Sequence, residues 1–359
     1  MERRRNLDIC KAVAMIFIII CHVLQRSTPH FTSNWPSSFI LVMGVPIFFF
    51  ISGTCISFRG PLSPKAFAYD ILKRALMYMW PFVLFIFLRV GFYQQWKDFA
   101  SGWSYILSSP SSGLWVLWVL VWLNLFADIG LLISYWIPKM KSLIVAITLV
   151  IAFIVFICLR QGNVIYDNSF LGYDLFVIYT PIFFIGFLLG GKIFSFYNRD
   201  VSIILCVFGL IATLVASIFV KPFLSVHIED NLAVYYVISL CAICFYYGMS
   251  TLLERVRVGE LLAFSGRFTL EAYFLHLVLI KNWTSFNLNN VPLTILASFG
   301  LTLLCIVNTV AVVAVLYFIP FGHFLMFGRH LSIYKFENHI FDKVKNFFLL
   351  ERKNTENML

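Results

Sequence analysis

Residues 142–159 read SLIVAITLVIAFIVFICL, an apolar run without a single charged side chain. A helix needs about 20 such residues to cross the roughly 30 Å of hydrocarbon in a bilayer, so this run predicts a membrane-spanning helix. The whole chain has the same character, because 61% of its 359 residues are hydrophobic, only 12% are charged, and the mean hydropathy is +0.88. An ordinary soluble domain is about 45–50% apolar and about 25% charged. The composition therefore excludes soluble enzymes, disordered chains and secreted disulfide scaffolds.

Further apolar runs predict an all-α fold, a polytopic bundle of about ten transmembrane helices. Phe occurs 40 times while Gly and Pro are sparse, which favours continuous helices over the alternating strands of a barrel. We expect the spans at residues 10–27, 36–58, 75–95, 114–136, 142–159, 174–192, 201–219, 232–252, 266–283 and 291–320.

Lys and Arg gather in alternate connections between these spans and in both terminal segments. Cytoplasmic loops of membrane proteins carry an excess of Lys and Arg, so the pattern predicts that both termini are cytoplasmic. The net charge of +10 has the same explanation, and we expect no binding of nucleic acid. The basic N-terminus is interpreted as a retained first helix rather than a cleaved signal peptide, because Lys11 and His22 interrupt its apolar run.

The expected organisation is one integral-membrane domain over residues 1–328 and a cytoplasmic tail over residues 329–359, in which aromatic residues mix with Lys and Glu. Such a tail is typical of an amphipathic segment that lies on the inner membrane surface. The eight cysteines fall mostly inside apolar runs, where a thiol packs as a small hydrophobic group, so the sequence indicates no disulfide framework. It also contains no recognisable metal-ligand set.

Two ionisable residues, Lys11 and His22, lie in the first apolar run. Their spacing corresponds to about three helical turns plus 20°, so both side chains lie on one helix face, about 16 Å apart along the axis. Because ionisable groups within a membrane are costly unless they face a polar cavity or a partner, we expect both to line one cavity. Lys11 would lie near its cytoplasmic mouth and His22 nearer mid-membrane. Alternatively, Lys11 extends to the interface and His22 bonds a neighbouring carbonyl.

The next two spans contain further polar or small residues. In GVPIFFFISG, Pro46, Ser52 and Gly53 interrupt an aromatic run. Small residues allow either close packing of helices or backbone contact with a ligand. Lys73 and Arg74 lie at the inner edge of the third expected span. A basic pair there suits phosphate binding, but it also fits the ordinary charge bias of cytoplasmic loops.

Two later spans present residues on one helical face. Trp115 is the first of three tryptophans at i, i+3 and i+7 in the fourth span, a pattern that fits either an interfacial aromatic belt or the wall of a binding site. Thr269, Tyr273 and His276 share a face near the C-terminal end. His276 indicates either a polar cavity or a histidine satisfied by packing. We expect Asp128 to be interfacial.

In their order and spacing, these motifs resemble the integral-membrane acyltransferase family three, which includes O-antigen and other cell-surface polysaccharide O-acetyltransferases. Lys11 and His22 match the family's basic-x10-His motif, whereas Lys73 and Arg74 depart from the Arg-x-x-Arg form of many members. The resemblance extends over essentially the whole chain. It rests on the segments NLDICKAVAMIFIIICH, GVPIFFFISG, LWVLWVL, PIFFIGFLLGG and SGRFTLEAYFLH.

The resemblance implies transfer of an acyl group, usually acetyl, from cytoplasmic acyl-CoA to a hydroxyl of an envelope glycan or its lipid-linked precursor. Acyl-CoA would be a co-substrate rather than a permanently bound cofactor, and no metal is implied. The implied location is the inner or plasma membrane of a bacterium, in contact with membrane lipids.

The same resemblance assigns roles to individual residues. His22 and His276 would be catalytic, with His22 acting as a general base on the acceptor hydroxyl or carrying the acyl group transiently. The cations that would neutralise CoA phosphates are Lys11, Lys73 and Arg74. The residues that would contact the substrates are Ser52, Trp115 and Tyr273.

The main alternative function is a transporter or flippase for a lipid-linked glycan, since ten spans with polar residues near the midplane suit transport as well. A sensor or structural partner of envelope synthesis is a third hypothesis. An enzyme would consume acetyl-CoA and release a free thiol, whereas a transporter would move its substrate without acyl-CoA.

Overall fold

The computed structural model describes residues 4–27, 35–91, 97–108, 114–161, 172–195, 198–220, 232–281, 291–328 and 342. Within these ranges the chain is helical and contains no strand, which confirms the predicted all-α fold. Nine helices in the described ranges are long and apolar enough to cross a membrane, as expected for a multi-pass membrane protein. The predicted tail at residues 329–359 lies, apart from residue 342, outside the described residues.

Nine of the ten predicted spans overlap these helices, and the exception is the span predicted at residues 266–283. Eight of the nine agree to within several residues at both ends, whereas the third begins at Pro64 instead of residue 75. In the segment 266–283 a 3-10 turn, η8 (Gly266–Phe268), leads into α15 (Thr269–Lys281), a helix of 13 residues. The described residues of this segment end at Lys281. Whether the segment forms a tenth span therefore stays a prediction.

The chain divides into two compact units, unit 1 with Met1–Cys55 and Ile185–Thr309, and unit 2 with Ile56–Phe184 and Val310–Leu359. Unit 1 holds α1 (Arg5–Ser27), α2 (Trp35–Gly44), most of α3 (Pro46–Ser57), η6 (Gly186–Gly190), α10 (Gly191–Ile193), α11 (Arg199–Val220), α13 (Leu232–Leu253), α14 (Arg257–Ser265), η8, α15 and most of α16 (Val291–Tyr317). Unit 2 holds α4 (Pro64–Arg74), η2 (Ala75–Met79), α5 (Trp80–Gly91), α6 (Phe99–Ser108), α7 (Trp115–Ile133), η4 (Pro138–Met140), α8 (Lys141–Gln161), nearly all of α9 (Tyr173–Ile185) and α17 (Gly322–Phe327).

Helix α1 is the central helix of unit 1, in contact with α2, α13, α14 and α15. Its residues are buried on several faces, as expected for a helix surrounded by others. The approach to η8 is especially close, because a Cβ atom at Gly266 would lie 1.9 Å from the carbonyl oxygen of Asp8. Only glycine fits there, which explains the glycine of the SGRF motif.

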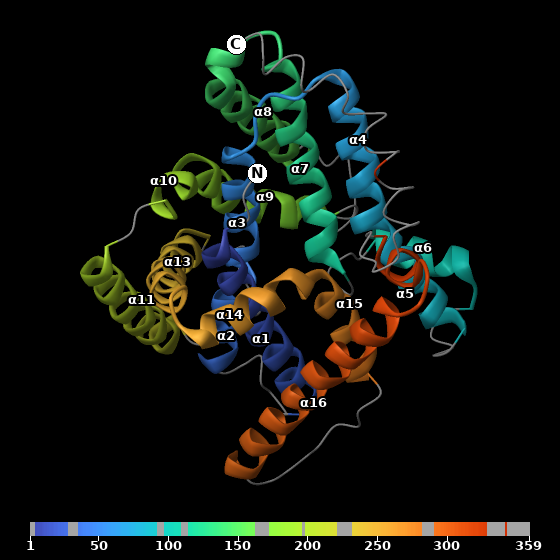
Figure 1. Cartoon of the computed structure of the whole chain (residues 1–359), viewed down its shortest axis with the longest axis vertical. Helices are drawn as coiled ribbons and strands as arrows, with labels where there is room; N and C mark the ends of the chain where they lie inside the picture. Colours follow the sequence, from blue (N-terminus) through green and yellow to red (C-terminus); the bar gives the residue numbers. More distant parts are fainter. Residues whose placement is uncertain are drawn as a thin grey trace. The chain divides into compact units, whose positions relative to one another are not determined.

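Helices α11 and α13 run side by side within unit 1 (Figure 1). A Cβ atom at Gly209 would lie 2.4 Å from the backbone nitrogen of Phe245, and one at Gly248 would lie 2.3 Å from the carbonyl oxygen of Ser202. Small residues at these positions bring the two backbones into contact, as in many membrane helix pairs.

The glycines of PIFFIGFLLGG serve the same purpose against α3. A Cβ atom at Gly186 would lie 2.1 Å from the carbonyl oxygen of Phe50, and one at Gly190 would lie 1.9 Å from Thr54 Oγ1. The Thr54 hydroxyl lies 2.9 Å from the carbonyl oxygen of Phe50 and 3.2 Å from that of Gly186, so it can donate to either. The Gly186 carbonyl belongs to η6, a π-helical turn, where the ordinary pattern of helix bonding is interrupted.

In unit 2, α7 packs against α4, η2 and α8, and Figure 1 shows α7 and α8 side by side. The third apolar span begins at Pro64 rather than at residue 75, because Ser63 caps the helix by accepting from the backbone N–H of Ala66 at 3.3 Å. Lys73 and Arg74 therefore lie inside the helical segment Pro64–Gly91 and not at its edge, which corrects the sequence prediction.

We expect Gly186→Ala to destabilise the protein by about 1–3 kcal/mol, because the new methyl group would overlap the Phe50 carbonyl. The midpoint of thermal unfolding, measured on protein purified in detergent, should fall. Gly300→Ala is the matched control, since a Cβ atom on that helical glycine meets nothing within 4 Å. Its midpoint should be unchanged or higher, and equal midpoints for the two variants would contradict the close packing at Gly186.

Candidate functional site

Two histidines from distant parts of the sequence meet in unit 1. His22 on α1 and His276 on α15 have ring centroids 5.2 Å apart, with their planes inclined by 33°. His276 is fully buried and His22 is half-buried. The helix α1 begins at Arg5, and the apolar span on it ends at Gln25, so His22 lies in the last turn of that span. That His22 lies nearer mid-membrane than Lys11 stays a prediction.

The hydrogen bonds of both imidazoles fix the same tautomer. His22 Nδ1 lies 3.0 Å from Gln25 Oε1, and His276 Nδ1 lies 3.0 Å from the carbonyl oxygen of Ala272. An amide or carbonyl oxygen only accepts, so each Nδ1 must carry the hydrogen and donate it. In a neutral ring, Nε2 then holds the lone pair. Both histidines are thus arranged to use Nε2 as the basic nitrogen.

The surroundings of His276 are aromatic and closely packed. The Tyr273 ring centroid lies 5.4 Å from that of His276, and only 7% of Tyr273 is exposed. His276 Nε2 is buried without a hydrogen-bond partner among the described residues. Buried polar atoms in folded proteins nearly always have a partner, so this nitrogen is chemically unusual. The structure thus brings together His22, Tyr273 and His276, three of the residues that the sequence singled out.

Lys11 lies on the same helix as His22, and its ammonium pairs with a neighbouring carboxylate. The distance from Lys11 Nζ to Asp8 Oδ1 is 3.4 Å, with 27% of the Lys11 side chain and 5% of the Asp8 side chain exposed. Asp8 was not among the predicted residues, although its position three residues before Lys11 on a helix is a signal for such a pair. Whether a common cavity joins Lys11 and His22 stays a prediction.

Ser52 lies half-buried on α3 in unit 1, and its role stays a prediction. The other predicted site residues belong to unit 2. There Trp115 packs its ring 5.3 Å from that of Tyr179, and Lys73 is exposed on α4. The neighbouring Trp118 is 8% exposed and packs edge-on against Phe82, so it forms part of the packed interior of unit 2.

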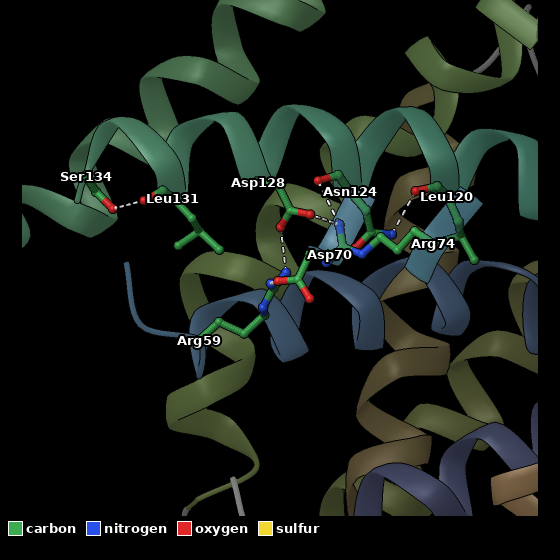
Figure 2. Close-up of polar contacts among 8 residues, drawn as sticks. All are labelled: Arg59, Asp70, Arg74, Leu120, Asn124, Asp128, Leu131 and Ser134. Carbon is green, nitrogen blue, oxygen red and sulfur yellow. Dashed lines mark hydrogen bonds and ion pairs between the residues drawn. The ribbon is translucent and has the colours of Figure 1, made fainter. Parts of the chain in front are cut away.

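Arg74 forms an ion pair that the sequence did not indicate. Its Nη1 atom pairs with Asp128 Oδ2 and lies 2.9 Å from the carbonyl oxygen of Asn124. Asp128 is fully buried on α7, so its carboxylate is enclosed by protein, while its interfacial depth in the membrane stays a prediction. Arg59 Nη1 lies 2.5 Å from Asp128 Oδ1, and its Nη2 atom pairs with Asp70 (Figure 2). The signal for this network was an acidic residue inside an apolar run.

The hydrogen bond to Gln25 predicts that the neutral form of His22 carries its hydrogen on Nδ1. Protein labelled with ¹⁵N at histidine and reconstituted in lipid should show a protonated Nδ1 and an unprotonated Nε2 for this residue by NMR. Gln25→Leu should weaken this preference at His22 and leave His276, which bonds Ala272, as an internal control. Finding the hydrogen of wild-type His22 on Nε2 would contradict the assignment.

Comparison with known proteins identifies the family. A family model described as an acyltransferase domain matches residues 4–336. No curated protein and no solved structure matches the chain. The matched range includes all of the motifs quoted above, from the first helix with Lys11 and His22 to the segment with His276. This chain therefore belongs to acyltransferase family three, the family that its motifs resemble.

Proposed function

We propose that this acyltransferase moves an acyl group, with acetyl as the expected one, from cytoplasmic acyl-CoA to a hydroxyl of a cell-surface polysaccharide or its lipid-linked precursor. The observation that carries the proposal is the pair of imidazoles at His22 and His276, both with Nδ1 anchored and Nε2 basic, in a chain of an acyltransferase family. A general base of this kind is what O-acylation needs, since a hydroxyl is a weak nucleophile until its proton is removed.

The reaction uses His22 Nε2 as the base. This nitrogen takes the proton of the acceptor hydroxyl while the oxygen attacks the thioester carbonyl. A C–O bond forms, the C–S bond breaks, and the imidazolium returns the proton to the departing sulfur, so that CoA leaves as a thiol. Positioned general bases contribute about 10²- to 10⁴-fold to a rate.

His276 and Tyr273 complete the wall behind this base. The ring of His276 lies against that of His22 at 5.2 Å between centroids, so it restricts the orientation of the catalytic imidazole. The anchored Nδ1 of His276 leaves its Nε2 as a second basic nitrogen in the same place. This second nitrogen can receive a proton that His22 has taken up.

Lys11 supplies a positive charge on the helix that bears His22. Its pairing with Asp8 holds the ammonium near the first turns of α1, and the part-exposed side chain leaves further N–H donors for a phosphate of the CoA moiety. Lys73 and Arg74 are proposed as additional cations for CoA, while Ser52 and Trp115 are proposed to contact the substrates.

The proposed location is the plasma or inner membrane of a bacterium, with both termini in the cytoplasm. The basic residues in alternate connections support this orientation. An even number of crossings is needed to place both termini on one side. With nine long helices in the described residues, the proposal requires that the segment with α15 supply the remaining crossing.

We expect His22→Ala to lower glycan acylation in cells by about 10²-fold or more, because the general base is lost. Lys11→Ala should abolish it too, through weaker binding of acyl-CoA. Both variants should accumulate in the membrane at near wild-type levels. His227→Ala, a histidine to which we assign no role, is the matched control, and normal acylation in His22→Ala cells would refute the role given to His22.

Purified protein should consume acetyl-CoA and release free CoA thiol when an acceptor glycan is added. A thiol-reactive dye measures this release, and mass spectrometry of surface glycans from cells with and without the gene identifies the acyl group and the acceptor. Movement of a lipid-linked glycan across vesicle membranes without thiol release would refute the enzyme and favour transport. The His22→Ala protein is the negative control for the thiol assay.

A further inference from the structure

The buried carboxylate of Asp128 is the centre of a charge network in unit 2. Figure 2 shows the guanidinium groups of Arg59 and Arg74 reaching its two oxygens. Arg59 in turn pairs with Asp70. The network therefore contains two guanidinium and two carboxylate groups, whose charges cancel. A carboxylate with no exposed surface needs such partners, because an unpaired buried charge costs several kcal/mol.

The contacts of Arg74 are confined to one of its nitrogens. Nη1 pairs with Asp128 and lies 2.9 Å from the carbonyl oxygen of Asn124. Nε and Nη2 have no partner among the described residues, and 17% of the side chain is exposed. These two nitrogens form one edge of the planar guanidinium, with two parallel N–H groups. That edge has the geometry that binds a phosphate or carboxylate through two hydrogen bonds.

We propose that Asp128 is a positioning residue for Arg74. It holds Nη1 so that the opposite edge, Nε and Nη2, is presented to a phosphate of the acyl donor. Arg59 and Asp70 keep Asp128 in place from the other side. This inference rests on the proposed function, since it takes acyl-CoA as the donor. Asp128 lies outside the sequence motifs quoted above.

A purely structural role for the network makes a different prediction. If Arg74 only ties α4 to α7, then substituting Asp128 or Arg74 lowers the free energy of unfolding but leaves the CoA affinity of the folded protein unchanged. If Asp128 acts through Arg74, its removal has no further effect once Arg74 is gone. A double-mutant cycle on CoA affinity separates the two cases.

The experiment measures the Kd of CoA for detergent-purified protein by calorimetry. Asp128→Asn should weaken binding about tenfold or more, since the ion pair that holds Arg74 is lost. Arg74→Ala should weaken it at least as much, and the double variant should differ from Arg74→Ala by less than about twofold. In the acyl-transfer assay, Asp128→Asn should raise KM for acyl-CoA and change kcat little.

Two substitutions on α7 are matched controls. Ser134→Ala removes a buried hydroxyl that bonds only the Leu131 carbonyl, at 2.8 Å. Asn124→Ala removes an amide bonded to Leu120 at 2.7 Å but keeps the carbonyl that accepts from Arg74. Both should retain the wild-type Kd. Loss of CoA binding in Ser134→Ala would show that any damage to α7 has this effect and would overturn the proposal.

Asp128→Asn leaves two guanidinium groups with one carboxylate, that of Asp70, and this excess positive charge can prevent folding. The variant Arg59→Gln/Asp128→Asn restores the charge balance and still lacks the carboxylate that holds Arg74. It should show the same loss of CoA affinity. Wild-type affinity in this variant, or effects of Asp128→Asn and Arg74→Ala that multiply in the double variant, would overturn the positioning role.

The outcomes also separate this inference from the proposed function. If wild-type protein binds no CoA, then both the proposed donor and the positioning role are wrong. If it binds CoA but transfers no acyl group, the proposed reaction is wrong, while the binding cycle still decides the role of Asp128.

Discussion

A charged group inside an apolar helix must find its partner within the protein, because the hydrocarbon of a bilayer offers neither water nor counter-ions. Three ion pairs among the described residues follow from that constraint. Asp8 and Lys11 pair along α1 in unit 1, and Asp128 on α7 pairs with Arg59 and Arg74 in unit 2. In unit 2 these pairs join α7 to α4 and to the segment before it.

The second constraint is steric, and it connects the packing of unit 1 to the histidine pair. Gly266 lets η8 approach the carbonyl of Asp8 more closely than any side chain would allow. Because η8 leads directly into α15, this contact sets the start of the helix that carries His276. The imidazole of His276 then meets that of His22 farther along α1. The close contact of Gly266 with the first turns of α1 is thus connected, through η8 and α15, to the histidine pair near the other end of α1.

The apolar helices could be predicted from the sequence because the ability of a segment to cross a membrane depends on its own length and composition. The run at 142–159 can therefore be recognised without knowing which helices pack against it. The start at Pro64 was missed because its first turns are polar, although Ser63 and Pro64 are ordinary signals for a helix N-terminus. The burial of Asp128 could not be derived, since it depends on Arg59 and Arg74, which are distant in the sequence. The proximity of His22 to His276 likewise follows from packing and not from spacing.

The shared tautomer of the two histidines limits the chemistry of the site. In each ring, a neighbouring oxygen on its own helix holds the Nδ1 hydrogen, so every reaction of the neutral ring must use Nε2. A general base and an acyl carrier both need that lone pair, and one imidazole cannot perform both roles in one step. If His22 carried the acyl group, its Nε2 would be acylated, and the acceptor hydroxyl would need another base. Nε2 of His276 could serve as that base, since the ring centroid of His276 lies 5.2 Å from that of His22 and this nitrogen has no hydrogen-bond partner in the described residues. The covalent route therefore needs a second base, a role that His276 could fill, whereas direct transfer needs only His22 as base.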